Sequence, residues 1–215
     1  MTAQIYFVSG IDTDIGKTVV TGWLAKRFAQ QGKKVITQKM IQTGCVDYST
    51  DIQTHRQIQG IEMTSFDKDG TTCPYLFAYP CSPHLAAQLE QKPIDPNFIQ
   101  KSTALLAEHY DIVLLEGAGG LAVPYNDTEI TLDYLTQQRY PVILVTSGRL
   151  GSINHTILSL LACRQLKIEV AMVVFNNYPN LDELITDNTK DYLQRYLQTH
   201  FPVTEWLEVG EIEVC

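Results

Sequence analysis

The sequence predicts an α/β fold in which a mostly parallel sheet is covered by helices on both faces. Short apolar runs rich in β-branched residues alternate along the chain with longer segments of helical periodicity. Such alternation is typical of strand–helix–strand crossovers, whose parallel strands are buried on both sides. With 215 residues, of which 45% are hydrophobic and 19% charged, the chain suits one domain, 1–215, with a sizeable core.

The expected elements follow in order along the chain. The strands are placed in the most apolar runs, at 5–9, 35–39, 111–115, 142–146 and 170–175. The helices are placed in the periodic segments, at 18–31, 97–109, 131–138, 152–166 and 181–198. Gly32 stops the first helix. The proline-punctuated segment 60–83 is expected to be a long surface excursion and not a second domain.

The stretch from Ser9 to Thr18 joins the first strand to the first helix. It reads SGIDTDIGKT, with five residues between Gly10 and Gly16 where the usual P-loop pattern has four. Backbone N–H groups of such a loop and the helix N-terminus attract phosphate, Lys17 reaches the β- and γ-phosphates, and the Thr18 hydroxyl binds Mg²⁺. The alternative is an ordinary turn with a solvated lysine. Gly-Lys-Thr at the helix start favours a P-loop nucleotide-binding fold.

Other strand ends carry chemistry that suits the same site. Ligands of open parallel sheets bind beyond the carboxyl ends of the strands. Glu116 follows a fully apolar strand, where a nucleotide-binding fold holds Mg²⁺, and Asp51 could supply a second carboxylate. Lys39 ends the strand expected beside the phosphate-loop strand and would add positive charge for phosphoryl transfer. The alternatives are a capping carboxylate for Glu116, a simple N-cap for Asp51 and a solvated side chain for Lys39.

Composition and charge narrow the possible partners. The net charge is −8 and no run of Lys or Arg marks a basic patch, so we expect a small-molecule partner and no nucleic acid. The first residues show no basic targeting segment, and no apolar run approaches the roughly 18 residues of a membrane span. We therefore expect a cytoplasmic protein without a membrane partner.

The cysteines fit reduced thiols better than a disulfide framework, because they are odd in number and widely spaced. They are Cys45, Cys73, Cys81, Cys163 and Cys215. A metal site at Cys73, Cys81 and His84 is conceivable. Since it lacks a second ligand pair at standard spacing, buried or incidental thiols are favoured.

Four segments, in their order and spacing, resemble the dethiobiotin synthetase family. They are 10–18, Lys39 with Thr43-Gly44, 116–120 (EGAGG) and 151–155 (GSINH). The resemblance runs from about residue 5 to residue 177 and includes the SPH stretch at 82–84. The phosphate loop with its five spacer residues and the EGAGG run are together quite specific to this family.

The resemblance implies an ATP-dependent cyclo-ligase of biotin biosynthesis. Such an enzyme takes 7,8-diaminopelargonic acid, CO₂ from bicarbonate, ATP and Mg²⁺, and forms dethiobiotin through a carbamate and a carbamic–phosphoric mixed anhydride. No protein nucleophile is required, which agrees with the lack of a Ser-His-Asp or Cys-His pattern. The family also implies a homodimer with shared sites, in which the helix beginning near Gly151 receives the substrate carboxylate bound mainly to the other subunit. From the sequence alone, Gly151 and Ser152 could equally well be simple helix caps.

The resemblance also carries over a set of residue roles. The catalytic groups would be Lys17 and Lys39. The Mg²⁺ ligands would be Thr18, Asp51 and Glu116. The nucleotide-binding residues would be Asp14, Ile15, Gly16, Lys17, Thr18, Val19, Asp51, Glu116, Gly117, Ala118, Gly119, Asn176 and Asn177, with the last two reading the adenine edge. The substrate-binding residues would be Thr13, Thr43, Gly151, Ser152, Ile153 and Asn154.

The chain departs from the family pattern in two places. Met40 stands where the family commonly has Pro, which should loosen the turn after Lys39 without removing its ammonium group. Gly210-Glu211-Ile212 is followed by Glu213 where the family has Pro, so the nucleotide preference is left open.

Two other functional classes share parts of this pattern. A partition or septum-positioning ATPase would need an additional lysine at the start of the phosphate loop, where this chain has Ser9-Gly10. A related amidase, scaffold or binding module would lack Lys39 or Thr43. ATP turnover that depends on diamine and bicarbonate would separate the enzyme from both.

Overall fold

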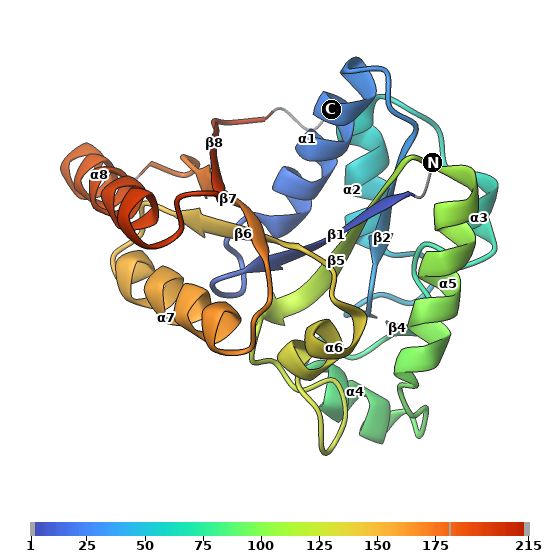
Figure 1. The fold of residues 1–215 in the computed structure, drawn as a ribbon. Helices are drawn as coiled ribbons and strands as arrows, with labels where there is room; N and C mark the ends of the chain where they lie inside the picture. The colour runs from blue at the N-terminus through green and yellow to red at the C-terminus, as the bar shows by residue number, and fades with distance from the viewer. Residues whose placement is uncertain (1–2, 181, 213–215) are drawn as a thin grey trace.

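The computed structural model describes residues 3–180 and 182–212, and within them six strands form one parallel sheet in the order β2-β5-β1-β6-β7-β8 (Figure 1). The strands are β1 (Gln4–Gly10), β2 (Val35–Lys39), β5 (Ile112–Gly120), β6 (Val142–Ser147), β7 (Val170–Asn176) and β8 (Glu205–Val209). A short parallel pair, β3 (Gln42–Thr43) and β4 (Leu76–Phe77), lies apart from this sheet. The predicted fold class is confirmed. Leu181, Glu213 and Cys215, interpreted above, lie outside the described residues.

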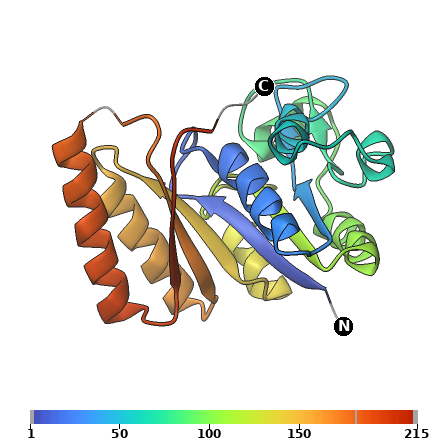
Figure 2. The ribbon, with the colours of Figure 1, turned by 90° about the horizontal axis from the view of Figure 1, so that it is seen from above.

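Helices cover both faces of the sheet, as Figure 2 shows from above. They are α1 (Lys17–Gln30), α2 (Thr50–Gln59), α3 (Ser65–Lys68), α4 (Pro83–Leu89), α5 (Pro96–His109), α6 (Thr131–Gln138), α7 (Ser152–Gln165) and α8 (Glu183–His200). No helix within the described residues is long and apolar enough to cross a membrane.

Side-chain alternation along the strands divides the core into two layers. Phe7 and Leu115 face the layer that α5, α6 and α7 cover, whereas their neighbours Val8 and Leu114 pack with α1. Glu116, two residues after Leu114, therefore points to the α1 side of the sheet. The pleat of β5 thus fixes which helices can contact this carboxylate.

Two expectations about the strands were wrong. Lys39 was expected on a strand beside the phosphate-loop strand, but β5 lies between β1 and β2. Glu116 was expected at a strand end, but β5 continues to Gly120, so Glu116 lies inside the strand. The first error arose because strand order depends on tertiary packing, which local sequence does not show. The second arose because glycine has low strand propensity, so the glycines after Glu116 did not indicate that β5 continues.

A buried ion pair fixes α2 to the rest of the fold. The Arg56 guanidinium is 2% exposed and binds Asp67 of α3 through two bonds, Nε to Oδ2 at 2.9 Å and Nη2 to Oδ1 at 2.7 Å. Arg56 also donates to the Thr37 hydroxyl of β2 at 2.7 Å. Burial works to raise the pKa of Asp67, but its hydrogen bonds and attraction to Arg56 outweigh burial and lower it.

We predict that Asp67→Asn lowers the free energy of unfolding by about 3–5 kcal/mol at neutral pH, because it leaves the Arg56 charge buried without its partner. The folded-state pKa of Asp67 is depressed, so the contribution of the pair is complete above the ordinary carboxyl range near pH 4. It is lost as the pH falls through the folded-state value. Urea unfolding at several pH values measures this difference.

Asp187→Asn is the control, since Asp187 has a side chain that is 73% exposed and should change stability little. A difference between wild type and Asp67→Asn that does not shrink on acidification would contradict the assignment of the effect to this ion pair.

Candidate functional site

The loop between β1 and α1 has the geometry expected of a phosphate loop. Gly16, directly before α1, has a φ of 91°, a left-handed conformation that favours glycine. Lys17 is buried, and its ammonium Nζ donates to the Asp12 carbonyl at 3.0 Å, so the side chain curls over the loop. Burial, and then the nearby Lys39 ammonium, lower the pKa of Lys17. A phosphate bound here would stabilise the protonated form of Lys17 and raise its pKa again.

Asn176, at the end of β7, supports this loop from behind. Its amide Nδ2 donates to the Ile15 carbonyl at 3.2 Å, and its Oδ1 accepts the N–H of Tyr178 at 3.1 Å. A Cβ on Gly16 would lie 2.3 Å from Asn176 Nδ2. Gly16 is therefore required by close approach as well as by its φ. The neighbouring Asn177 donates through its amide to the Val209 carbonyl at 3.3 Å.

Glu116 is the centre of a polar cluster on the α1 side of the sheet. The parallel register pairs Lys39 of β2 with Glu116 of β5, so the two side chains leave the same face side by side. Lys39 Nζ donates to Glu116 Oε1 at 2.8 Å and to the Gly117 carbonyl at 3.1 Å, and it forms an ion pair with Asp51. Thr18, in the first turn of α1, donates its hydroxyl to Glu116 Oε1 at 3.2 Å.

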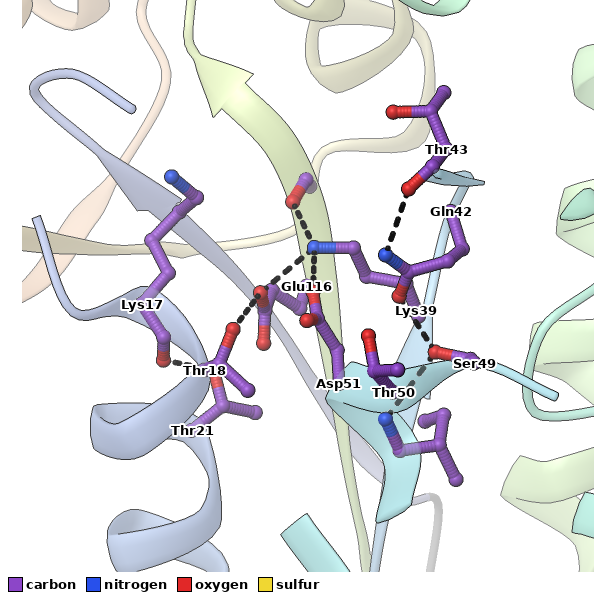
Figure 3. A network of polar contacts seen from close by, with 12 residues as sticks. Lys17, Thr18, Thr21, Lys39, Gln42, Thr43, Ser49, Thr50, Asp51 and Glu116 are labelled. Atoms are coloured by element: carbon purple, nitrogen blue, oxygen red, sulfur yellow. Dashed lines mark hydrogen bonds and ion pairs between the residues drawn. The ribbon is translucent and has the colours of Figure 1, made fainter. Parts of the chain in front are cut away.

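Figure 3 shows the Lys39 ammonium held between Asp51 and Glu116, whereas the side chain of Lys17 extends away from this cluster. Glu116 is completely buried. Burial works to raise its pKa, but Lys39 and then His55 outweigh burial and lower it well below the usual range. Burial likewise works against the charge on Lys39, and the carboxylates of Glu116 and Asp51 raise its pKa above the ordinary value. Lys39 and Glu116 are therefore both charged at neutral pH.

The N-terminus of α2 brings Asp51 to this cluster. Ser49 caps the helix by accepting the Ile52 N–H at 3.2 Å, and its hydroxyl donates to Gln42 Oε1 at 2.7 Å (Figure 3). Asp51 lies in the first turn and is not the cap, so the simple N-cap interpretation of Asp51 was wrong. The cap leaves the Asp51 carboxylate free to bind Lys39.

The cluster forms one wall of a cavity of about 730 Å³. Twelve residues singled out from the sequence line it: Thr13, Asp14, Gly16, Lys17, Thr18, Val19, Lys39, Thr43, Asp51, Glu116, Ala118 and Gly119. The structure therefore brings together the phosphate loop, both lysines and all three expected metal ligands. Asn176 and Asn177 do not line this cavity: Asn176 lies behind the phosphate loop, and Asn177 binds β8.

The segment 151–154 at the start of α7 also lies outside this cavity. Gly151 has a φ of 95° at the helix start, and Ser152 is buried with its Oγ 3.3 Å from Ser147 Oγ. Their role toward substrate stays a prediction, one that requires a second subunit.

The donors around Glu116 suit a hard divalent cation. Oxygen donors from three residues meet here: the carboxylates of Asp51 and Glu116 and the hydroxyl of Thr18. In this structure the Lys39 ammonium binds both carboxylates. Within residues 3–180 and 182–212 no group of three or more His, Cys, Asp or Glu side chains is arranged to hold a metal. Mg²⁺ fits such a sparse oxygen site because it retains waters and takes further oxygens from a bound nucleotide.

Sequence reasoning missed His55, whose Nε2 lies 2.8 Å from Glu116 Oε2. It also gave no site role to Gln42 or to residues 80–83, which line the cavity, although the SPH stretch at 82–84 was part of the resemblance. The only local signal for His55 was its spacing of four residues from Asp51, which places both side chains on one face of α2. No comparable local signal marked Gln42.

Comparison with known proteins gives relatives along almost the whole chain. The AAA domain family matches residues 4–212. An ATP-dependent dethiobiotin synthetase BioD 2 of Haemophilus ducreyi is 63% identical over 95% of this chain and 97% of its own length. The ATP-dependent dethiobiotin synthetase BioD of Chlorobaculum tepidum is 50% identical over 93% of this chain and 84% of its own.

Solved structures show the same fold at much lower identity. A plasmid partition protein of Borrelia burgdorferi bound to AMPPNP has a TM-score of 0.58 at 14% identity and covers 99% of this chain and 89% of its own. A ParA family ATPase of Chlorobium tepidum has a TM-score of 0.55 at 12% identity, and the match covers 98% of this chain and 85% of that protein. These similarities establish a P-loop nucleotide-binding fold and nothing more specific.

We predict that Gly16→Ala weakens ATP binding at least about tenfold, because the added methyl group meets Asn176 and the left-handed backbone becomes strained. Gly151→Ala is the matched control, since Gly151 has a similar φ of 95° but no atom within 4 Å of the added Cβ. Equilibrium binding of ATP measures both. Unaltered affinity in Gly16→Ala would show that the contact with Asn176 does not shape the loop.

Proposed function

Since the chain belongs to the dethiobiotin synthetase family, we propose that it uses ATP to close 7,8-diaminopelargonic acid and CO₂ into the cyclic urea of dethiobiotin. The observation that carries the proposal is the placement of Lys39 and the phosphate loop on the walls of one cavity. Its volume of about 730 Å³ is in the range typical of ligand pockets. Its two lysines, together with a divalent cation on the Asp51 and Glu116 carboxylates, would stabilise an anionic intermediate beside a triphosphate.

The proposed reaction has three steps. One amine of the substrate adds to CO₂ and loses a proton, which gives a carbamate. A carbamate oxygen attacks the γ-phosphorus of ATP and displaces ADP, which gives a carbamic–phosphoric mixed anhydride. The second amine then attacks the carbamoyl carbon and loses a proton, the ring closes, and phosphate leaves. Because the nucleophiles all come from the substrate, the protein contributes positioning and charge.

Lys17 and Lys39 take the electrostatic roles. Lys17 lies at the phosphate loop and would bind the β- and γ-phosphates. Lys39, whose partners are the Asp51 and Glu116 carboxylates, would face the carbamate and the transferring phosphoryl group. Both lysines are buried, so their attraction to the transferring group is screened less than in water. Thr13, Asp14 and Thr43 would contact the substrate from the same cavity.

Thr18, Asp51 and Glu116 would hold Mg²⁺, which when bound neutralises charge on the phosphates. The oxygen-only character of these donors supports this assignment. Glu116 is kept ionised by Lys39 and His55, so it is ready to serve as a ligand without first losing a proton.

The substrate carboxylate would be bound across a homodimer. The segment 151–154 lies outside the cavity of its own subunit, and it begins a helix whose first N–H groups attract anions. A partner subunit would therefore supply Gly151, Ser152, Ile153 and Asn154 to the site.

The test of the proposed function is ATP turnover in the presence and absence of the diamine and of bicarbonate. We expect ADP release only when both are present, in equal amount to dethiobiotin identified by mass spectrometry. ADP release that ignores the diamine would overturn the proposal and favour a nucleotide-driven switch protein.

Lys39→Ala should leave ATP affinity nearly unchanged and reduce dethiobiotin formation by at least about a hundredfold, the usual cost of losing one electrostatic stabiliser of the transition state. ATP binding and product formation are measured in parallel on the same preparation. Lys33→Ala, which removes an exposed lysine, is the control and should behave as wild type. Full activity in Lys39→Ala would rule out the assigned role.

A further inference from the structure

His55 is a fully buried histidine that contacts the central carboxylate of the site. Its Nε2 lies 2.8 Å from Glu116 Oε2, and its Nδ1 lies 3.0 Å from the Thr37 hydroxyl. Glu116 Oε1 is used by different donors, Thr18 and Lys39. The two oxygens of Glu116 therefore face different surroundings, one toward the cavity and one toward His55.

The helix α2 supplies two residues of this cluster, Asp51 at the cavity and His55 on the far side of Glu116. Asp51 and His55 are four residues apart, so they project from the same face of α2 toward the sheet. Asp51 binds Lys39 at the cavity, whereas His55 reaches Glu116 one helical turn deeper. Close packing holds this turn in place, because a Cβ on Gly22 of α1 would lie 3.2 Å from the His55 Cα.

The ionised Glu116 carboxylate can only accept hydrogen bonds, so Nε2 of His55 carries a proton and donates to Oε2. Arg56 Nη1 is always a donor, and it donates to Thr37 Oγ1 at 2.7 Å. The hydroxyl proton of Thr37 is then available for His55 Nδ1, the other polar atom within hydrogen-bond distance among the described residues. In this arrangement Nδ1 accepts from Thr37 while Nε2 donates to Glu116.

A directed chain of hydrogen bonds thus runs from Arg56 through Thr37 and His55 to Glu116. Arg56 is itself fixed by the two bonds to Asp67 described above. Every link is buried, so water does not compete for these donors and acceptors. Carboxylates that bind metal ions are themselves held by hydrogen bonds from residues behind them, and losing such a partner weakens metal binding.

We propose that His55 is a positioning residue for Glu116: it holds Oε2 so that Oε1 stays directed to the cavity, where a divalent cation binds beside the nucleotide. The proposal rests on the proposed function in so far as Glu116 is a cation ligand there. His55 contacts neither the nucleotide nor the reacting atoms, and it acts through the orientation of Glu116.

Two substitutions separate the Nε2 donor from the bulk of the ring. His55→Gln places an amide N–H donor near the position of Nε2, whereas His55→Asn is shorter and reaches only the position of Nδ1 beside Thr37. The measurement is Mn²⁺ binding, followed by electron paramagnetic resonance, to protein saturated with a non-hydrolysable ATP analogue. Affinity for the analogue without metal and the thermal unfolding midpoint are measured on the same samples.

We expect His55→Asn to weaken Mn²⁺ binding by about 10- to 100-fold, the usual effect of losing the residue that orients a metal ligand. His55→Gln should stay within about threefold of wild type, and the metal-free affinity for the analogue should be the same in all three. The Mg²⁺ concentration for half-maximal turnover should rise with the Mn²⁺ dissociation constant, with less effect on the rate at saturating Mg²⁺.

Equal Mn²⁺ affinity in both variants, whether unchanged or weakened alike, would overturn the proposal, because either result would mean that the Nε2 donor is not what matters. If His55→Asn does not fold, Thr37→Val carries the same test: it removes the hydroxyl that orients the ring and should weaken Mn²⁺ binding in the same direction. Unchanged affinity there would also contradict the proposal. Mn²⁺ binding needs no turnover, so a wild-type protein that makes no dethiobiotin would defeat the proposed function and leave this comparison valid.

Discussion

The burial of one negative charge, the Glu116 carboxylate, is the constraint on which the rest of the site depends. Removing an ion from water costs several kcal/mol, and the cost is offset only when charged or hydrogen-bonding partners surround it. Here the partners come from three elements: Lys39 from β2, Thr18 from α1 and His55 from α2. Each element must therefore dock in one place for the charge to be tolerated, and that docking is what builds the cavity.

The parallel sheet makes this convergence possible. The register of β2 against β5 places Lys39 beside Glu116, and the pleat sends both side chains to the face that α1 covers. The phosphate loop leaves β1, the next strand on the other side of β5, so its lysine reaches the same cavity from the opposite wall. The two lysines therefore meet at the same end of the sheet as the Asp51 and Glu116 carboxylates, which compensate the charge of Lys39.

How much of this could be read from the sequence depended on whether the signal was local. The phosphate loop and the strand before Glu116 were predictable, because periodicity and turn chemistry are properties of neighbouring residues. The order of strands was not, and β2 was placed beside β1 when β5 separates them. His55 was not predicted as a site residue, because its place in the site depends on contacts with Thr37 and Glu116, which are 18 and 61 residues away in the sequence.

The crystal structure of a complex with Mg²⁺, a non-hydrolysable ATP analogue and the diamine tests the central claim most directly. The account predicts a cation bound to Glu116 through Oε1, the His55 contact retained at Oε2, and the triphosphate between Lys17 and Lys39. A triphosphate bound away from these lysines, or a cation bound without Glu116, would contradict it.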